Sequence, residues 1–287
     1  MARKIVLTAP GNLRISALLR REISASRALM TELKKDPEGV LCDGRPAFLT
    51  AIPQSGSVIE ISIPESFEEE GRESSVAPSQ TVRSEVVFKN DDFAVLLKPS
   101  GMPTHPSRAH VYDTLANDFA ALFPGTVYRP ITRLDADTSG LVLVALNKAA
   151  ASIDRKSIER IYYGLTDRPV EPSFGVIDGP IERLEPFSPI RTVKADGKSA
   201  VTHYRAVCKI NGFTLIRFRL ETGRTHQIRV HSSYMGFPLC GDGLYGGSEV
   251  LQRQALHAAF IRFTDPITSK RISVGSKLPS DIRALLK

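Results

Sequence analysis

Residues 130–148, PITRLDADTSGLVLVALNK, decide the fold of this chain because they join a charged loop directly to a buried strand. Residues 140–146 form an almost uninterrupted run of small and apolar side chains, typical of a strand buried on both faces of a sheet. The preceding loop carries Arg133, Asp135 and Asp137 towards that strand. An unpaired carboxylate is costly next to a core, so the loop is a candidate functional site.

The length and charge of the chain indicate how many domains it has and which kind of partner it favours. With 287 residues, and with roughly 150 residues per domain as a guide, we expect one large domain and one small domain. Hydrophobic residues make up 42% of the chain, which is enough for a substantial core. Lys and Arg outnumber Asp and Glu by 38 to 31, and the resulting net charge of +7 favours polyanionic partners without requiring them.

The cysteines and the apolar runs indicate in which cellular compartment the protein is expected. Cys42, Cys208 and Cys240 are widely separated and form no CxxC pair, which indicates a reducing environment and no structural zinc. The start MARKIVLTAP lacks the apolar stretch of a signal peptide, and no run approaches the roughly 18 apolar residues of a membrane span. We therefore expect a cytoplasmic protein with no membrane partner.

An acidic, Ser-rich stretch divides the chain. Residues 65–80, ESFEEEGRESSVAPSQ, are almost without large apolar side chains and cannot offset their ordering entropy by burial. We predict a linker over residues 66–83, between a small domain of residues 1–65 and a large domain of residues 84–287.

The small domain is expected to contain two helices followed by strands. Helical spacing predicts a first helix through Ile15 to Ile23 and a second that starts at Ser24 or Ser26. Residues 39–64 alternate in polarity as strands do, with turns at Asp-Gly and Ser-Gly pairs. The helices carry five basic residues, which form either an RNA-binding face or a merely solvated one: Arg20, Arg21, Arg27, Lys34 and Lys35.

Strands dominate the expected large domain. Predicted strands cover residues 85–88, 93–97, 161–165, 200–209 and 213–221, in addition to 140–146. An amphipathic helix is predicted within residues 111–125, and a second helix is capped by Asn147. Because strands and helices do not alternate strictly, the pattern favours an α+β fold around a large sheet.

A second informative segment is LETGRTHQIRVHSSYMGFPLCGDGLYG, residues 220–246. Thr225 is a predicted N-cap for a helix over residues 226–235, which Gly236 and a following proline end. This helix start would place Arg224 beside free backbone amides, a setting that suits an anion.

Six motifs resemble those of the RluA-type pseudouridine synthases and occur in that family's order over residues 84–265: RLDADTSGLVLVA, RIYYGL, GKSAVTHY, LETGRTHQIRVH, GDGLYG and ALHA. The segments REISASRALMTEL and SGSVIEI make residues 1–65 similar to the α-L RNA-binding motif of ribosomal proteins. Two positions depart from the family pattern: Thr132 stands where His usually precedes Arg-Leu-Asp, and Arg160 stands where Lys usually precedes the motif tyrosine.

The resemblance implies a fold and an activity. The fold would be α+β, with a large mixed, mainly antiparallel sheet and flanking helices forming a central catalytic cleft. The activity would be the isomerisation of uridine to pseudouridine in structured RNA by a monomer. Large-subunit ribosomal RNA is the expected substrate and transfer RNA the second choice; a non-catalytic RNA-binding ribosome-assembly factor is the alternative from another class.

The resemblance also assigns the reacting groups. Asp135 would be the nucleophile, either attacking the nucleotide or assisting departure of C1′ and then deprotonating the sugar. Arg224 would be the partner of that carboxylate, since an Asp–Arg pair favours the ionised form. Tyr162 would stack on the flipped uracil and could also take part in proton transfer at C5, with Tyr163 as the competing assignment.

Extrusion of the base leaves a gap in the RNA stack, and Arg133 is the candidate to fill it. The alternative for Arg133 is a salt bridge to Asp137. No metal or cofactor is expected: His226 and His231, five residues apart on a helix, would point about 140° from each other and match no metal-binding spacing.

Overall fold

The computed structural model describes residues 4–23, 25, 27–63 and 76–287. The predicted start of the second helix, at Ser24 or Ser26, and most of the predicted linker lie outside the described residues. No helix in the described ranges has the length and apolar character needed to cross a bilayer.

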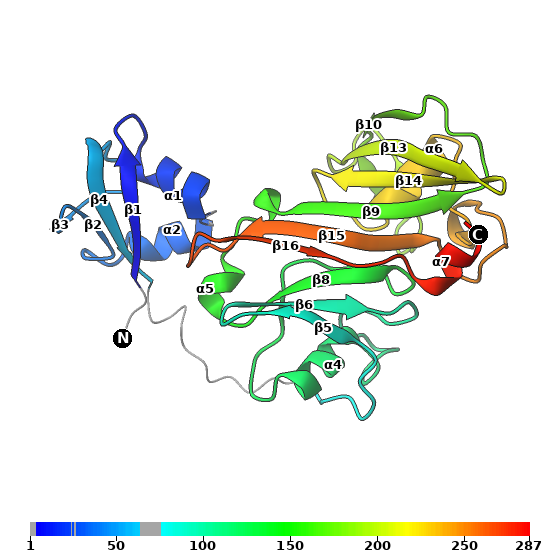
Figure 1. The fold of residues 1–287 in the computed structure, drawn as a ribbon, viewed down its shortest axis with the longest axis horizontal. Coiled ribbons are helices and arrows are strands. Elements are labelled where there is room, and N and C mark those ends of the chain that lie inside the picture. The colour runs from blue at the N-terminus through cyan, green and yellow to red at the C-terminus, as the bar shows by residue number, and fades with distance from the viewer. Residues whose placement is uncertain (1–3, 24, 26, 64–75) are drawn as a thin grey trace.

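The small N-terminal unit is an antiparallel four-stranded sheet with two helices on one side (Figure 1). The first helix buries the four apolar residues whose spacing predicted it, and these form the core with the inward side chains of the sheet. The strand order is β1-β4-β2-β3. The elements are β1 (Lys4–Pro10), α1 (Ile15–Ile23), α2 (Arg27–Leu33), β2 (Val40–Cys42), β3 (Arg45–Pro46) and β4 (Ser55–Ser62).

This unit packs directly on the rest of the molecule. Its core includes Ala149 of α5 (Lys148–Ala151) and is covered in part by Ile267, from the turn after β15. A β-bridge joins Ala25 to Ile153. Figure 1 accordingly shows α1 and α2 beside α5 and the end of the β15–β16 hairpin.

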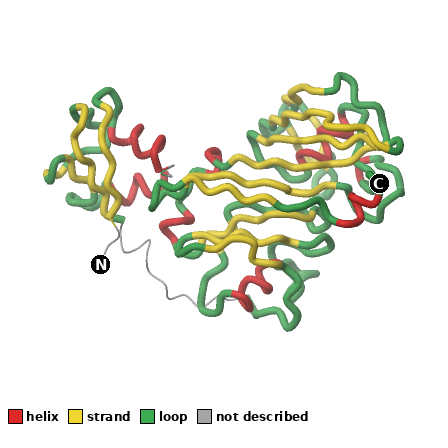
Figure 2. Tube along the Cα trace, in the orientation of Figure 1, coloured by secondary structure: helices red, strands yellow, loops and turns green. Residues whose placement is uncertain are grey.

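The large unit is built on one ten-stranded sheet, and strands predominate over helices throughout it (Figure 2). The main path runs β10-β13-β14-β9-β15-β8-β6-β5, with β16 beside β15 and β7 beside β8. The strands are β5 (Glu85–Lys89), β6 (Phe93–Lys98), β7 (Arg129–Pro130), β8 (Ser139–Ala145), β9 (Glu159–Thr166), β10 (Phe174–Asp178), β13 (Val201–Ile210), β14 (Phe213–Leu220), β15 (Leu256–Thr264) and β16 (Arg271–Gly275).

Short helices and one hairpin surround this sheet. They are α4 (Leu115–Leu122), α6 (Gln227–Tyr234), α7 (Ser280–Ala284), the 3-10 turns η1 (Arg155–Ser157) and η2 (Gly243–Tyr245), and the hairpin of β11 (Ile181–Arg183) with β12 (Arg191–Val193). The Asn147 side chain accepts a hydrogen bond from Ala150 N, so the predicted cap of α5 is confirmed. The predicted α+β class and mainly antiparallel sheet are also confirmed.

Strand β8 lies at the centre and is buried on both faces, as its apolar run predicts. Val142 and Val144 face the core that contains Phe119 of α4. Leu141 and Leu143 face the opposite core. The charged loop before β8 therefore reaches the middle of the molecule.

Strand pairing brings the end of this loop level with Tyr162 of β9. Gly140 of β8 pairs with Ala258 of β15, and Ala258 pairs in turn with Tyr162 of β9. The backbones approach so closely that a Cβ on Gly140, whose φ is +122°, would lie 2.3 Å from the Ala258 carbonyl oxygen. Only glycine fits this position.

The last part of the predicted linker is not a spacer. Asn117 of α4 donates to the Ala77 carbonyl oxygen at 2.8 Å. The buried carboxylate of Asp118 accepts from the backbone N–H groups of Arg83 and Ser84, at 2.9 and 2.8 Å. Residues 77–84 thus belong to the large unit, because two polar side chains of a buried helix require them as partners.

Candidate active site

A buried lysine, Lys98, donates a hydrogen bond to the loop of residues 131–138. Lys98 is fully buried and donates from Nζ to the carbonyl oxygens of Pro99, Met102 and Ala136, at 2.8, 2.7 and 2.7 Å. Burial lowers the pKa of Lys98 to about 7, against the opposing charges of Asp137 and Asp135. Through the Ala136 carbonyl oxygen, Lys98 ties the loop to the end of β6 and to the segment that follows it.

Two hydroxyl groups complete this support. Thr104 donates to the Leu134 carbonyl oxygen at 2.7 Å and accepts from the Leu134 N–H at 3.1 Å. Thr132, at the position where the family usually has His, accepts from Leu143 N–H at 2.9 Å. The Thr132 hydroxyl therefore fastens the loop to β8.

The cationic partner of Asp135 is Arg229, so the predicted pairing with Arg224 is wrong. Nη1 of Arg229 lies 3.5 Å from Oδ2 of Asp135, whose side chain is 27% exposed. The same guanidinium makes a two-pronged pair with Asp242, from Nε at 2.7 Å and Nη2 at 2.8 Å. Burial opposes the charge on Arg229, but Asp242 and Asp135 outweigh it and raise its pKa.

The hydrogen bonds that Arg224 makes just before α6 account for this difference. The N-cap is His226, in the left-handed conformation with φ 58°, and not Thr225. Oε1 of Gln227 accepts from the Arg224 N–H at 2.9 Å, while Arg224 donates from Nε to the Ser199 carbonyl oxygen at 2.9 Å. Arg224 is thereby held at the wall of the site, and Arg229, one turn into the helix, faces Asp135.

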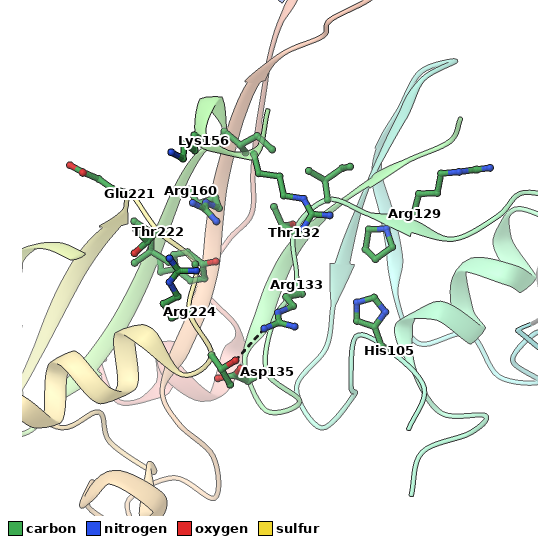
Figure 3. Close-up of a pocket in the computed structure, with 18 of the residues that line it drawn as sticks. His105, Arg129, Thr132, Arg133, Asp135, Lys156, Arg160, Glu221, Thr222 and Arg224 are labelled. Carbon is green, nitrogen blue, oxygen red and sulfur yellow. Dashed lines mark hydrogen bonds between the residues drawn. The ribbon is translucent and has the colours of Figure 1, made fainter. Parts of the chain in front are cut away.

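A cavity of about 740 Å³ opens above the carboxylate. In Figure 3, Arg133 and Arg224 reach in from opposite sides, and Asp135 lies between and below them. Six basic side chains line this cavity: Arg129, Arg133, Arg155, Lys156, Arg160 and Arg224. Such a surface attracts polyanions.

A smaller cavity, of about 50 Å³, adjoins Asp135 and is lined by polar and apolar side chains alike. Its walls include Tyr162, Leu220 and Ile228. Burial raises the pKa of Tyr162, so the phenol is neutral at ordinary pH. Tyr163, the competing assignment, packs in a different cluster with Leu165 and so faces away from this site.

Arg133 reaches across the cavity. Its Nη2 donates to Thr225 Oγ1 at 3.1 Å, the contact drawn as a dashed line in Figure 3. The alternative salt bridge to Asp137 is absent from the ion pairs of the described residues. The Arg133 side chain is exposed and lies at the cavity mouth.

None of the predicted RNA-binding residues of the small unit lines this cavity. Arg20, Arg21, Lys34 and Lys35 are exposed. Arg21 is paired with Glu22 at 2.6 Å and Lys35 with Glu32 at 2.7 Å. Arg27 is the first residue of α2, and its side chain lies outside what the structure describes.

Three functional residues escaped the sequence interpretation: Lys98, Arg229 and Asp242. Arg229 was available as the second arginine of the motif that contains Arg224, and a lysine that ends an apolar strand was a signal for Lys98. The described residues contain no cluster of three metal-ligating side chains. His231 already contacts Thr202 Oγ1 and the Gly179 carbonyl oxygen through its two ring nitrogens.

The geometry suits an attack on a nucleotide. A carboxylate with a guanidinium counter-charge lies where a basic cavity meets a small, tyrosine-walled pocket. The basic part can hold phosphates, and the pocket can hold a flat, uncharged ring.

Comparisons with known proteins agree with this geometry. The family model for RNA pseudouridylate synthases matches residues 92–234. The uncharacterized RNA pseudouridine synthase YjbO of Bacillus subtilis is 34% identical over 276 residues, which cover 93% of this chain and 96% of that protein. Ribosomal large subunit pseudouridine synthase D of Pseudomonas aeruginosa is 37% identical over 232 residues, which cover 72% of each protein.

A solved structure shows the same fold. The human protein RNA Pseudouridylate Synthase Domain Containing 1 aligns with a TM-score of 0.58 at 26% identity, over 70% of this chain and 86% of that one. The predicted family and enzyme class are confirmed. The chain belongs to the RluA-type family of RNA pseudouridine synthases.

Proposed function

We propose that this enzyme isomerises uridine in large-subunit ribosomal RNA, with Asp135 as the reacting group. The observation that carries the proposal is the position of Asp135, 3.5 Å from Arg229 and between the basic cavity and the pocket walled by Tyr162. The name of the Pseudomonas aeruginosa relative, a ribosomal large subunit enzyme, supports the substrate class.

The reaction detaches uracil from C1′, rotates the base and rejoins it through C5. The C5 hydrogen leaves as a proton, N1 gains one, and no external reagent is consumed. Asp135 either bonds to C1′ as the base departs or takes a proton from the sugar after departure. In both routes the carboxylate must face the ribose, and Arg229 supplies its counter-charge.

Tyr162 provides a surface for the extruded base. Because burial raises its pKa, the phenol stays protonated and acts by stacking and by donating a hydrogen bond. This makes it a poor general base for the C5 proton. Arg133, exposed at the mouth of the cavity, is positioned to stack in the place that the uridine leaves.

The basic cavity serves the phosphates that flank the target. Arg155, Lys156 and Arg160 line its side towards α5, against which the small unit packs. We assign RNA binding to residues 1–65 and catalysis to the predicted domain of residues 84–287, to which the last part of the predicted linker, from Ala77 on, also belongs. The exposed basic residues of α1 and of the chain after α2 support this division.

The test is a map of pseudouridines in total RNA from cells without the protein, complemented with wild type or with Asp135→Asn. We expect at least one large-subunit ribosomal site to disappear, to return with wild type and to stay absent with the variant. Loss of transfer RNA sites alone would contradict the substrate class. Full restoration by Asp135→Asn would contradict the assigned chemistry.

A further inference from the structure

The GDGLYG motif, residues 241–246, packs behind the side chains that face Asp135. Gly241, with φ +73°, lies so close to the chain at Arg253 that a Cβ would fall 1.9 Å from its carbonyl oxygen. This close packing fixes the segment and the two side chains that it carries towards α6, Asp242 and Tyr245.

Asp242 fixes the guanidinium of Arg229. Its side chain is 1% exposed, and its two oxygens accept from Nε and Nη2 at 2.7 and 2.8 Å. The ring of Tyr245 covers the same guanidinium, with Arg229 Cζ 5.0 Å from the ring centre. With two nitrogens occupied and one face covered, Nη1 is left to point at Asp135.

The hydroxyl group of Tyr245 also lies within hydrogen-bond distance of the His226 ring. The hydroxyl oxygen accepts from Arg191 N–H at 3.0 Å and lies 2.9 Å from Nδ1 of His226. Burial raises the pKa of Tyr245, so its hydroxyl retains a proton to donate. Among the described residues, Nδ1 is the one acceptor in reach of that proton. Nδ1 is then an acceptor, and the neutral ring carries its hydrogen on Nε2.

The Nε2–H of His226 faces the reacting carboxylate. Nε2 lies 3.9 Å from Oδ2 of Asp135, the same oxygen that Arg229 approaches. No hydrogen bond or ion pair among the described residues reaches Oδ1. The ring is held there by an uncommon left-handed backbone, φ 58°, a form of strain that occurs at functional sites.

We propose that Asp242 and Tyr245 are positioning residues that aim Arg229 and the Nε2–H of His226 at one oxygen of Asp135, leaving the other oxygen for the nucleotide. This inference rests on the proposed role of Asp135. It gives the GDGLYG motif a function in the reaction, through two groups that do not themselves touch the substrate.

Burial favours the neutral form of the His226 ring, against the anions that face it. Asp135 and Asp242 face it as anions, and Arg229 and Arg191 as cations. Burial, together with the two cations, outweighs the anions and lowers the pKa of His226. At 3.9 Å the neutral Nε2–H lies beyond hydrogen-bond distance of Oδ2, so the ring presents a dipole, and not a full positive charge, to the carboxylate.

The first experiment reads the tautomer. In protein labelled with ¹⁵N-histidine, long-range proton–nitrogen spectra separate protonated from unprotonated ring nitrogens, and His226→Gln identifies the signal. Wild type should show Nδ1 unprotonated and Nε2 protonated near pH 7. Tyr245→Phe should give a mixture of tautomers. A wild-type ring protonated on Nδ1, or an unchanged spectrum in Tyr245→Phe, would overturn the proposal.

The second experiment measures single-turnover rate and RNA affinity separately. Tyr245→Phe keeps the ring over Arg229 and removes one hydrogen bond, so we expect turnover to fall about tenfold with affinity unchanged. The matched control is Tyr234→Phe, on the exposed side of α6. Equal turnover in Tyr245→Phe and Tyr234→Phe would contradict the inference.

Asp135→Asn, tested in the same assay, keeps the two proposals distinct. An inactive Asp135→Asn beside a fully active Tyr245→Phe would refute only the positioning role. Turnover by Asp135→Asn at the wild-type rate would refute the reaction assignment on which that role depends.

Discussion

Replacing Arg229 with Lys keeps the charge near Asp135 but removes the fork that holds it there. At the observed 3.5 Å, a full ion pair is worth about 5 kcal/mol at an effective dielectric constant of 20, before the opposing cost of desolvating both ions. A lysine has one donor head and cannot hold both oxygens of Asp242 while pointing at Asp135. We expect a net loss near 3 kcal/mol, or about a 10²-fold lower kcat.

The assay is single-turnover release of tritium from RNA labelled at uridine C5, at saturating RNA, with affinity measured separately. Arg224→Lys is the matched control, because Arg224 lines the same cavity but donates its hydrogen bond to the Ser199 carbonyl oxygen and not to Asp135. It should alter affinity and leave kcat within about threefold of wild type. A 10²-fold loss in Arg224→Lys, with Arg229→Lys within about threefold of wild type, would refute the pairing described above.

Folding must be separated from chemistry in this experiment. Removing Arg229 altogether leaves the buried Asp242 unpaired, which costs about 3–5 kcal/mol of stability. Thermal melts of each variant show whether the loss of turnover comes from the folded enzyme. The double change Arg229→Met with Asp242→Leu removes both ions, so it should regain most of the stability and none of the turnover.

Three further changes test other parts of the structure. Burial lowers the pKa of His257 from 6.5 to about 4, so the neutral ring contributes its full stability above pH 6.5 and this contribution is lost as the pH falls towards 4. In urea unfolding, His257→Gln should therefore reduce the loss of unfolding free energy between pH 6.5 and pH 4 by up to about 3 kcal/mol. Gly140→Ala should cost at least about 3 kcal/mol in the same assay, whereas Gly212→Ala, also at positive φ but with open space around the new Cβ, should cost about 1 kcal/mol. Replacing Arg20 and Lys34 with Gln should lower the salt slope of RNA binding by roughly 0.7 to 0.9 per lost phosphate contact, with kcat unchanged; an identical slope would exclude a role for these two residues.

Local patterns predicted the centre of the fold well. The apolar run before Asn147 is a strand buried on both faces, and the strand that contains Tyr162 lies where its sequence indicated. Neighbouring side chains face opposite sides of a sheet, so alternation along β9 allows only one of Tyr162 and Tyr163 to face the site, and the structure shows that it is Tyr162. These features depend on short-range periodicity, which a sequence displays directly.

The partner of Asp135 could not be read in the same way. Arg224 and Arg229 lie five residues apart in one motif, and the motif itself does not show which of them faces Asp135. Thr225 has the better N-cap chemistry, but His226 occupies that position in a left-handed conformation. Arg229 lies inside the helix for either start and Arg224 lies before it, so the pairing depends on how α6 packs against the loop before β8, which the motif does not display.

Long-range polar contacts were equally hidden. Lys98 reaches the Ala136 carbonyl oxygen 38 positions away, and Asp118 accepts from Ser84 34 positions back. Such pairs leave no periodic trace, because each depends on how two segments pack. The end of the predicted linker was misjudged for this reason: its composition is polar, but its backbone donors satisfy a buried carboxylate.

The most direct test of the central claim compares Asp135→Asn with Asp137→Asn in tritium release from C5-labelled large-subunit ribosomal RNA. Both carboxylates lie in one loop, but Asp135 faces Arg229, whereas the Asp137 side chain is exposed. Each asparagine preserves the shape of the residue it replaces. If Asp135 is the reacting group, its variant binds this RNA and releases no tritium, while Asp137→Asn turns over near the wild-type rate. Tritium release by Asp135→Asn at a rate close to that of wild type would contradict the account.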